Sequence, residues 1–187
     1  MIYVFLADGF EEIEAVAPID ILRRAGFEVI TVKVGENPGD LKVTGSHGIE
    51  ITADIHESKI DNFANLEMIV LPGGGAGVEN LYRSEILRGL VDYCVEHKIK
   101  IGAICAAPSI LARLDYLKNT RATAYPSFRY YLKDGGAIVA EENDKVVTDG
   151  IFTTAAAAGV SVEFGLELVR ILKGEEQAKI IGEQILF

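Results

Sequence analysis

The sequence of 187 residues contains no tryptophan, only two cysteines and only three histidines. Two cysteines, Cys94 and Cys105, are too few for the disulfide framework that holds small secreted proteins together. The three histidines show no spacing typical of a zinc site, so we expect no metal centre. This composition predicts a cytoplasmic protein that works in a reducing compartment.

Basic residues are also scarce. The chain has 18 of them against 28 acidic residues, which gives a formal charge of -10. Such a surface repels phosphate backbones and anionic lipids, so we expect neither a nucleic acid nor a membrane as a partner. The apolar start of the chain lacks a basic region and is too short for a signal peptide, and no apolar run is long enough to span a membrane.

Hydrophobic residues are abundant, at 49% of the chain. This content predicts a packed globular protein, which we interpret as one domain over residues 1–187. Buried strands are predicted at residues 2–6, 28–34, 67–71 and 99–104, with weaker strands at 42–46, 49–52, 122–125, 137–140, 145–148 and 151–154. Helices are predicted at residues 11–25, 84–97, 160–173 and 175–186. This alternation indicates an α/β fold with a mostly parallel sheet covered by helices on both faces.

The first predicted helix has an apolar face, an internal proline and an acidic first turn. Its period places six residues on an inward apolar face: Ile13, Val16, Ala17, Ile19, Ile21 and Leu22. Pro18 within the helix predicts a kink or tight packing. Glu11 and Glu12 in the first turn are typical of acidic helix capping.

Three segments follow predicted strands at their carboxyl ends, where ligands bind in open α/β sheets: residues 7–14, residues 72–77 and Cys105. Cys105 is expected at a sharp turn from strand to helix, with Pro108 in the first helical turn. The helix N-terminus would favour a thiolate there. The alternative is a small, inert, buried side chain, which is how we interpret Cys94.

Two further elements of a site are predicted beside the cysteine. The glycines at 73–75 form either a plain surface turn or a loop whose backbone N–H groups, with that of Ala106, make an oxyanion hole. Glu14 lies among apolar residues, so its burial would raise its pKa and let it donate a hydrogen bond to a thiolate. The histidines offer little, because none is expected beside the cysteine.

Three motifs, LADGFEEIE at 6–14, VLPGG at 70–74 and AICAAP at 103–108, make the chain similar to the DJ-1/ThiJ/PfpI superfamily, closest to its DJ-1/YajL branch. The resemblance implies a flavodoxin-like three-layer sandwich, a homodimer and a nucleophile elbow at Cys105. It also implies that Glu14 hydrogen-bonds the thiolate or its sulfinate. Gly74 and Ala106 match the backbone donors near the sulfur.

The chain departs from the family pattern at several positions. Tyr125-Pro126 stands where the DJ-1 branch commonly has a His-Pro pair, and tyrosine, with a pKa of about 10, is a poor base at neutral pH. Ala106 follows the cysteine where PfpI-type proteases have histidine, and no histidine completes an amidotransferase triad, so a peptidase is not expected. Alanines at 155–158 replace a more polar stretch.

Three hypotheses remain open. The first is a cofactor-independent, glyoxalase- or deglycase-type enzyme, in which Cys105 adds to 2-oxoaldehydes such as methylglyoxal. The second is a non-enzymatic stress-protection or chaperone protein whose cysteine is oxidised to a sulfinate. The third is a domain whose cysteine is inactive, with a thiol pKa near 8.5. The expected partners are a small aldehyde or an oxidant, and a second copy of the chain.

Overall fold

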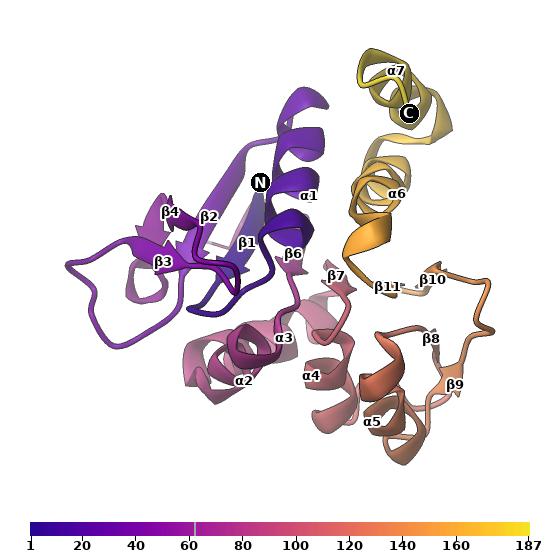
Figure 1. Ribbon diagram of the computed structural model, residues 1–187, viewed down its shortest axis with the longest axis horizontal. Coiled ribbons are helices and arrows are strands. Elements are labelled where there is room, and N and C mark those ends of the chain that lie inside the picture. The colour runs from indigo at the N-terminus through magenta and orange to yellow at the C-terminus, as the bar shows by residue number, and fades with distance from the viewer. Residues whose placement is uncertain (62) are drawn as a thin grey trace.

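The computed structural model describes residues 1–61 and 63–187, and its centre is a mostly parallel sheet (Figure 1). Within the described residues, seven strands lie in the order β10-β11-β7-β6-β1-β2-β5. Their bounds are β1 (Ile2–Leu6), β2 (Val29–Lys33), β5 (Ile55–His56), β6 (Met68–Leu71), β7 (Lys100–Ile104), β10 (Val146–Asp149) and β11 (Phe152–Ala155). All neighbours pair in parallel except β10 and β11, which are antiparallel.

Helices cover both faces of this sheet (Figure 1). The helices are α1 (Glu12–Arg24), α2 (Gly75–Arg83), α3 (Glu85–His97), α4 (Pro108–Arg113), α5 (Arg129–Asp134), α6 (Ser161–Lys173) and α7 (Glu175–Gln184). Side chains alternate along β1, so Val4 and Leu6 pack with α1 and α6, while Tyr3 and Phe5 face the core under α2 to α4. The predicted α/β fold with helices on both faces is confirmed.

Short elements complete the architecture outside the main sheet. An antiparallel pair is formed by β3 (Lys42–Thr44) and β4 (Glu50–Thr52), joined by the turn at residues 45–49. A second, parallel pair is formed by β8 (Arg121–Ala122) and β9 (Ile138–Val139). Single 3₁₀ turns lie at Glu57–Lys59, Pro126–Phe128 and Ala158–Val160. Among the described residues, no helix has both the length and the apolar character to cross a membrane.

The inward face predicted for α1 is wrong at two positions. Ile13 and Val16 are 56% and 46% exposed, whereas Ile19, Ile21 and Leu22 are buried. The apolar positions extend around more of the helix than the sheet and α6 can cover, so part of them stays on the surface. Pro18 is buried within a continuous α1, where it packs closely against α6. The homodimer implied by the resemblance stays a prediction.

The segment predicted as a glycine loop at 72–77 is in part helical, because α2 begins at Gly75. Glycine is unfavourable in the interior of a helix, so the glycine-rich sequence did not predict this helix. Gly77 is required by packing: a Cβ there would lie 2.7 Å from the backbone nitrogen of Phe10 and 2.8 Å from its Cα. The close approach fixes α2 against the turn that follows β1.

We predict opposite effects for two Gly→Ala substitutions in neighbouring helices. Gly77→Ala should destabilise the protein by about 1–3 kcal/mol, because the backbone at Phe10 must move to admit the methyl group. Gly89→Ala in α3, where a Cβ meets nothing within 4 Å, should stabilise it by about 0.5–1 kcal/mol through helix propensity. Urea unfolding measures both, and a Gly77→Ala protein as stable as wild type would contradict the packing argument.

Candidate active site

Cys105 lies in the tight turn between β7 and α4. Its φ of 63° is in the left-handed region, which costs a non-glycine residue about 1–2 kcal/mol. Both of its backbone groups are held: its N–H donates to the Ala155 carbonyl at 2.8 Å, and its carbonyl accepts the Tyr125 N–H at 2.9 Å. The predicted turn from strand to helix is therefore present, and it places the Cys105 side chain at the carboxyl edge of the sheet.

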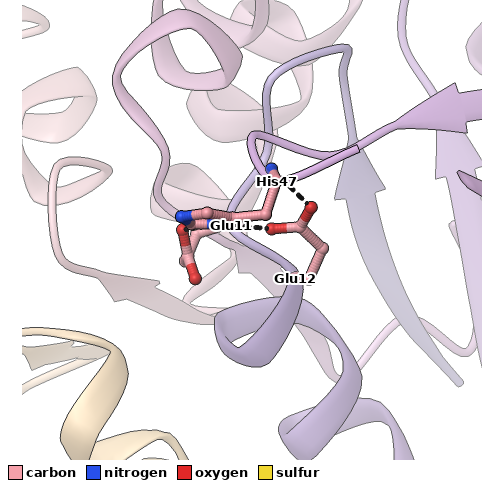
Figure 2. Close-up of side chains that lie close together, drawn as sticks. All are labelled: Glu11, Glu12 and His47. Atoms are coloured by element: carbon pink, nitrogen blue, oxygen red, sulfur yellow. Dashed lines mark hydrogen bonds and ion pairs between the residues drawn. The ribbon is translucent and has the colours of Figure 1, made fainter. Parts of the chain in front are cut away.

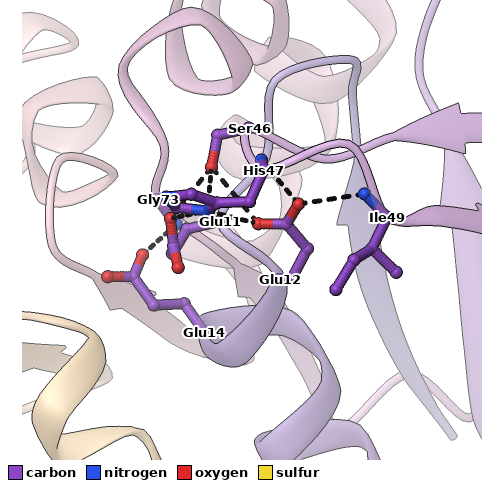
Figure 3. A network of polar contacts seen from close by, with 7 residues as sticks. All are labelled: Glu11, Glu12, Glu14, Ser46, His47, Ile49 and Gly73. Atoms are coloured by element: carbon purple, nitrogen blue, oxygen red, sulfur yellow. Dashed lines mark hydrogen bonds and ion pairs between the residues drawn. The ribbon is translucent and has the colours of Figure 1, made fainter.

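Glu14 reaches this edge from the first turn of α1. Its side chain is buried, and its Oε2 accepts the Gly73 N–H at 2.9 Å (Figure 3). The carboxyl also hydrogen-bonds the Cys105 thiol, and burial raises its pKa to about 7. A Cβ on Gly73 would collide with the Glu14 carboxyl and lie 2.7 Å from the Cys105 Cβ. Only glycine lets the three residues meet.

Two backbone N–H groups lie beside the cysteine sulfur, those of Gly74 and Ala106. Among the described residues, neither group donates to a backbone carbonyl. Gly74 has a φ of 91°, and a Cβ there would collide with the Gly9 carbonyl oxygen. Both amides hydrogen-bond the Cys105 sulfur, and the oxyanion hole expected from the sequence stays a prediction.

The ionisation of Cys105 differs from the expectation of a thiolate stabilised by a helix N-terminus. Burial, and then the Glu14 carboxylate, raise the pKa of the thiol to about 12, although the Ala106 and Gly74 amides act in the opposite direction. The helix α4 is only six residues long, so its dipole is small against these effects. Two acids in contact titrate as a pair, and a thiolate forms when the remaining proton lies on Glu14.

Cys105 opens into a cavity of about 430 Å³. Its walls come from several parts of the chain: Glu11 and Glu14, Ser46, Gly74 and Gly75, Cys105 and Ala106, Tyr125 and Phe128, and Ala157 to Gly159. Tyr125 therefore does lie at the site, although its hydrogen bond with Cys105 is made through the backbone. Ser46 and Phe128 were not predicted, because a turn serine and a lone aromatic carry no local signal of a site.

The turn at 45–49 is held against α1 by a cluster of Glu11, Glu12 and His47 (Figure 2) together with Ser46 (Figure 3). Glu12 Oε1 accepts the His47 N–H at 2.7 Å, and Glu12 Oε2 lies 2.9 Å from His47 Nδ1. The Ser46 hydroxyl donates to Glu11 Oε2 at 2.9 Å. Burial opposes ionisation of Glu12, but the hydrogen bonds from His47 outweigh it and lower the pKa of Glu12 to about 2. The same contact raises the pKa of His47.

This cluster corrects the interpretation of Glu11 and Glu12 as helix caps. Glu11 makes no side-chain cap bond, and both carboxylates bind the turn instead. The ligand atoms of Glu11, Glu12 and His47 lie within 4.8 Å of one another, as in a metal site. All three already hydrogen-bond the Ser46 hydroxyl, and Glu12 also hydrogen-bonds His47, so we assign the cluster the role of fixing Ser46 in the cavity wall.

The other candidate residues lie away from the cavity. Cys94 is fully buried in the core, as predicted, and burial raises its pKa to about 12. His56 contacts the Gly35 carbonyl, and His97 contacts the Tyr93 carbonyl. His47 does not line the cysteine cavity either, although its contacts Glu11 and Ser46 do.

We predict that Glu14→Gln stabilises the protein above neutral pH. A carboxyl whose pKa rises from 4.5 to about 7 on folding favours the folded state when protonated, and this advantage is lost as the pH rises through 7. Glutamine carries no such penalty, so the variant should be more stable than wild type by about 2–3 kcal/mol at pH 8 and equal to it near pH 4. Urea unfolding at both pH values measures the difference.

The matched control is Glu163→Gln, which removes an exposed carboxylate from α6. It should show no comparable gain between pH 4 and pH 8. Equal stability of Glu14→Gln and wild type at pH 8 would contradict the raised pKa of Glu14.

Comparison with known proteins places this geometry in a family. The model of the DJ-1/PfpI family matches residues 1–171. Protein DJ-1 homolog B of Arabidopsis thaliana is 35% identical over 99% of this chain, which spans only 41% of that relative. Protein dj-1beta of Drosophila melanogaster is 32% identical over 98% of this chain and 95% of its own. The Glutathione-independent glyoxalase DJ-1 of Schizosaccharomyces pombe is 32% identical over 97% of this chain and 96% of its own.

Solved structures agree with these sequence relatives. The structure titled Toxoplasma gondii DJ-1, oxidized, matches with a TM-score of 0.91 at 33% identity, covering 100% of this chain and 97% of that one. Drosophila melanogaster DJ-1beta matches with a TM-score of 0.90 at 30% identity, covering 99% and 96%. The chain has the flavodoxin-like fold of these proteins and belongs to the DJ-1/PfpI family.

Proposed function

We propose that this protein is a cysteine-dependent enzyme that converts 2-oxoaldehydes such as methylglyoxal to 2-hydroxy acids without a cofactor. The observation that carries the proposal is the contact between the Cys105 thiol and a carboxyl, Glu14, whose pKa of about 7 lets it both accept and donate a proton. The name of the Schizosaccharomyces pombe relative, a glutathione-independent glyoxalase, supports the same chemistry.

The first step is the addition of the thiol to the aldehyde. The Glu14 carboxylate takes the thiol proton, and the sulfur of Cys105 forms a bond to the aldehyde carbon. The carbonyl π electrons move to oxygen, where the Gly74 and Ala106 amides can stabilise the negative charge. Glu14 then returns the proton to this oxygen. The product is a neutral hemithioacetal, and the carboxylate is regenerated.

The second step moves hydrogen between the two adjacent carbons. Glu14 removes the proton from the former aldehyde carbon and delivers it to the neighbouring carbonyl oxygen, while the electron pair of the C–H bond forms the double bond of an enediol. Glu14 then takes the proton from the hydroxyl on the former aldehyde carbon and delivers it to the neighbouring carbon. The C=O bond of a thioester forms as the C=C bond is lost, and water hydrolyses the thioester to the hydroxy acid and the free thiol. One carbon is oxidised while its neighbour is reduced, so the reaction needs no external oxidant or reductant.

We predict lactate formation from methylglyoxal by the purified protein. Cys105→Ala should lower the rate by about 10³-fold or more, and Glu14→Gln by about 10²–10⁴-fold. The active form has lost one proton from the Cys105–Glu14 pair, so the rate should rise with pH through about 7. Lactate formation that survives Cys105→Ala, or that is absent from wild type, would overturn the proposal.

A second candidate function is that of an oxidation-responsive protein, and Tyr125 favours it. A phenol replaces the histidine expected from the family, so Glu14 is left to carry all proton transfers at the sulfur. Thiolate oxidation by peroxide needs fewer transfers: the sulfur displaces hydroxide from one peroxide to form a sulfenic acid, and a second peroxide yields the sulfinate. A protonated Glu14 and the two amides are suitable donors to sulfinate oxygens. The Toxoplasma gondii structure is titled as an oxidized protein.

We predict that mild peroxide adds two oxygen atoms to Cys105 and none to Cys94, which is fully buried. Intact-mass and peptide mass spectrometry measure the addition, with Cys105→Ala as the control. Glu14→Gln cannot stabilise a sulfinate through an acidic proton, so it should yield less of it at equal peroxide. An unmodified Cys105 alongside an oxidised Met1, a partly exposed methionine, would exclude this second function.

A further inference from the structure

A second cavity of about 430 Å³ adjoins the cysteine cavity. Three residues, Tyr125, Ala157 and Gly159, line both cavities, so the two lie side by side. The walls beyond these residues carry charge, from Arg129 on α5 and from Lys145 and Glu142 before β10. The cysteine cavity alone already exceeds what a three-carbon aldehyde fills, and the second cavity extends it toward two cationic side chains.

Arg129 is held in place but forms no ion pair among the described residues. Its Nε donates to the Ala124 carbonyl at 3.1 Å, and its Nη2 lies 3.4 Å from Thr123 Oγ1. Most other arginines of this acidic chain do form ion pairs, namely Arg23, Arg24, Arg88, Arg113, Arg121 and Arg170. Arg129 is thus a positioned guanidinium with donor capacity left for an oxyanion.

Lys145 lines the same cavity. Its carbonyl accepts the Ala156 N–H at 2.8 Å, which ties its backbone to the segment that lines the cysteine cavity. In the described part of the chain, neither Lys145 nor Glu142 takes part in an ion pair. The cavity therefore carries two cations against one carboxylate in a protein whose formal charge is -10.

We propose that the second cavity is a subsite for the carboxylate of the substrate, and that the preferred substrates are 2-oxoaldehydes with an acidic group a few carbons beyond the reacting carbonyls. This inference rests on the proposed reaction at Cys105. Arg129 and Lys145 bind the carboxylate, while Tyr125 and Ala157 line the path of the connecting carbons. Methylglyoxal has only a methyl group beyond its carbonyls and leaves this subsite unused.

The first test measures charge selectivity at Cys105 without any turnover. The thiolate attacks an aromatic disulfide and releases an aromatic thiolate, which is followed by absorbance. The anionic reagent is 5,5′-dithiobis(2-nitrobenzoate), the neutral reagent is 4,4′-dithiodipyridine, and buried Cys94 stays silent with both. The rate constant for the anionic reagent, divided by that for the neutral reagent, gives a selectivity ratio. This ratio should fall by about fivefold to tenfold in Lys145→Gln and in Arg129→Gln.

Three further variants separate a local subsite from general charge. Lys133→Gln removes an exposed cation of α5 that does not line the cavity, and it should leave the ratio unchanged. Glu142→Gln removes the opposing carboxylate and should raise the ratio. Arg129→Lys keeps a charge and should retain part of the selectivity, which guards against a folding defect in Arg129→Gln. A fall in Lys133→Gln equal to that in Lys145→Gln would overturn the subsite.

The second test compares turnover of two aldehydes, methylglyoxal and 4,5-dioxopentanoate, a 2-oxoaldehyde with a carboxylate two carbons away. The KM for 4,5-dioxopentanoate should be the lower of the two, and Lys145→Gln should raise it by about fivefold to tenfold. Turnover of both aldehydes with equal KM, together with an unaltered reagent ratio, would overturn the subsite and leave the proposed function intact. A Cys105 that reacts with neither disulfide and turns over neither aldehyde would overturn both.

Discussion

The contact between the Glu14 carboxyl and the Cys105 thiol is the constraint around which this site is built. Two acids meet in a buried place where water cannot stabilise two negative charges, so the pair keeps at least one proton over a wide pH range. Burial raises both pKa values, and the amides of Gly73, Gly74 and Ala106 decide where the remaining negative charge is best placed. The site is thus a proton-sharing pair with fixed donors around it.

Much of the surrounding structure serves to hold this contact. The left-handed backbone at Cys105 is anchored on both sides, by Ala155 and by Tyr125, so its strain is met by hydrogen bonds from separate segments. Gly73 leaves room for the carboxyl and the thiol to meet. Gly77 lets α2 approach the turn after β1, which brings the glycine loop to the same edge. Packing throughout the core offsets the free-energy cost of burying the Glu14 carboxyl and of the left-handed backbone at Cys105.

The sequence predicted the features that depend on one segment at a time. The apolar run before Cys105 and the small residues after it indicated the turn, and the apolar neighbours of Glu14 indicated its burial. The errors arise where distant segments meet. Glu12 binds His47, 35 residues away, so its role as a clamp cannot be read from the helix start. Ile13 has an apolar side chain at a plausible spacing, but the extent of the surface offered by α6 and the sheet decides what is covered.

The two candidate functions use the same ionisation state of the pair, a thiolate beside a protonated carboxyl. They differ in the steps after a bond has formed at sulfur. Aldehyde addition returns the thiol at the end of each cycle, and it requires that Glu14 alternate between acid and base, for which a pKa of about 7 is well suited. Oxidation leaves a sulfinate, which stays negatively charged. Fixed hydrogen-bond donors matter more for stabilising this anion than a group that exchanges protons. The two adjoining cavities, one at Cys105 and one at Arg129 with Tyr125 lining both, argue for the former, because an oxidant as small as peroxide needs neither the second cavity nor a positioned guanidinium.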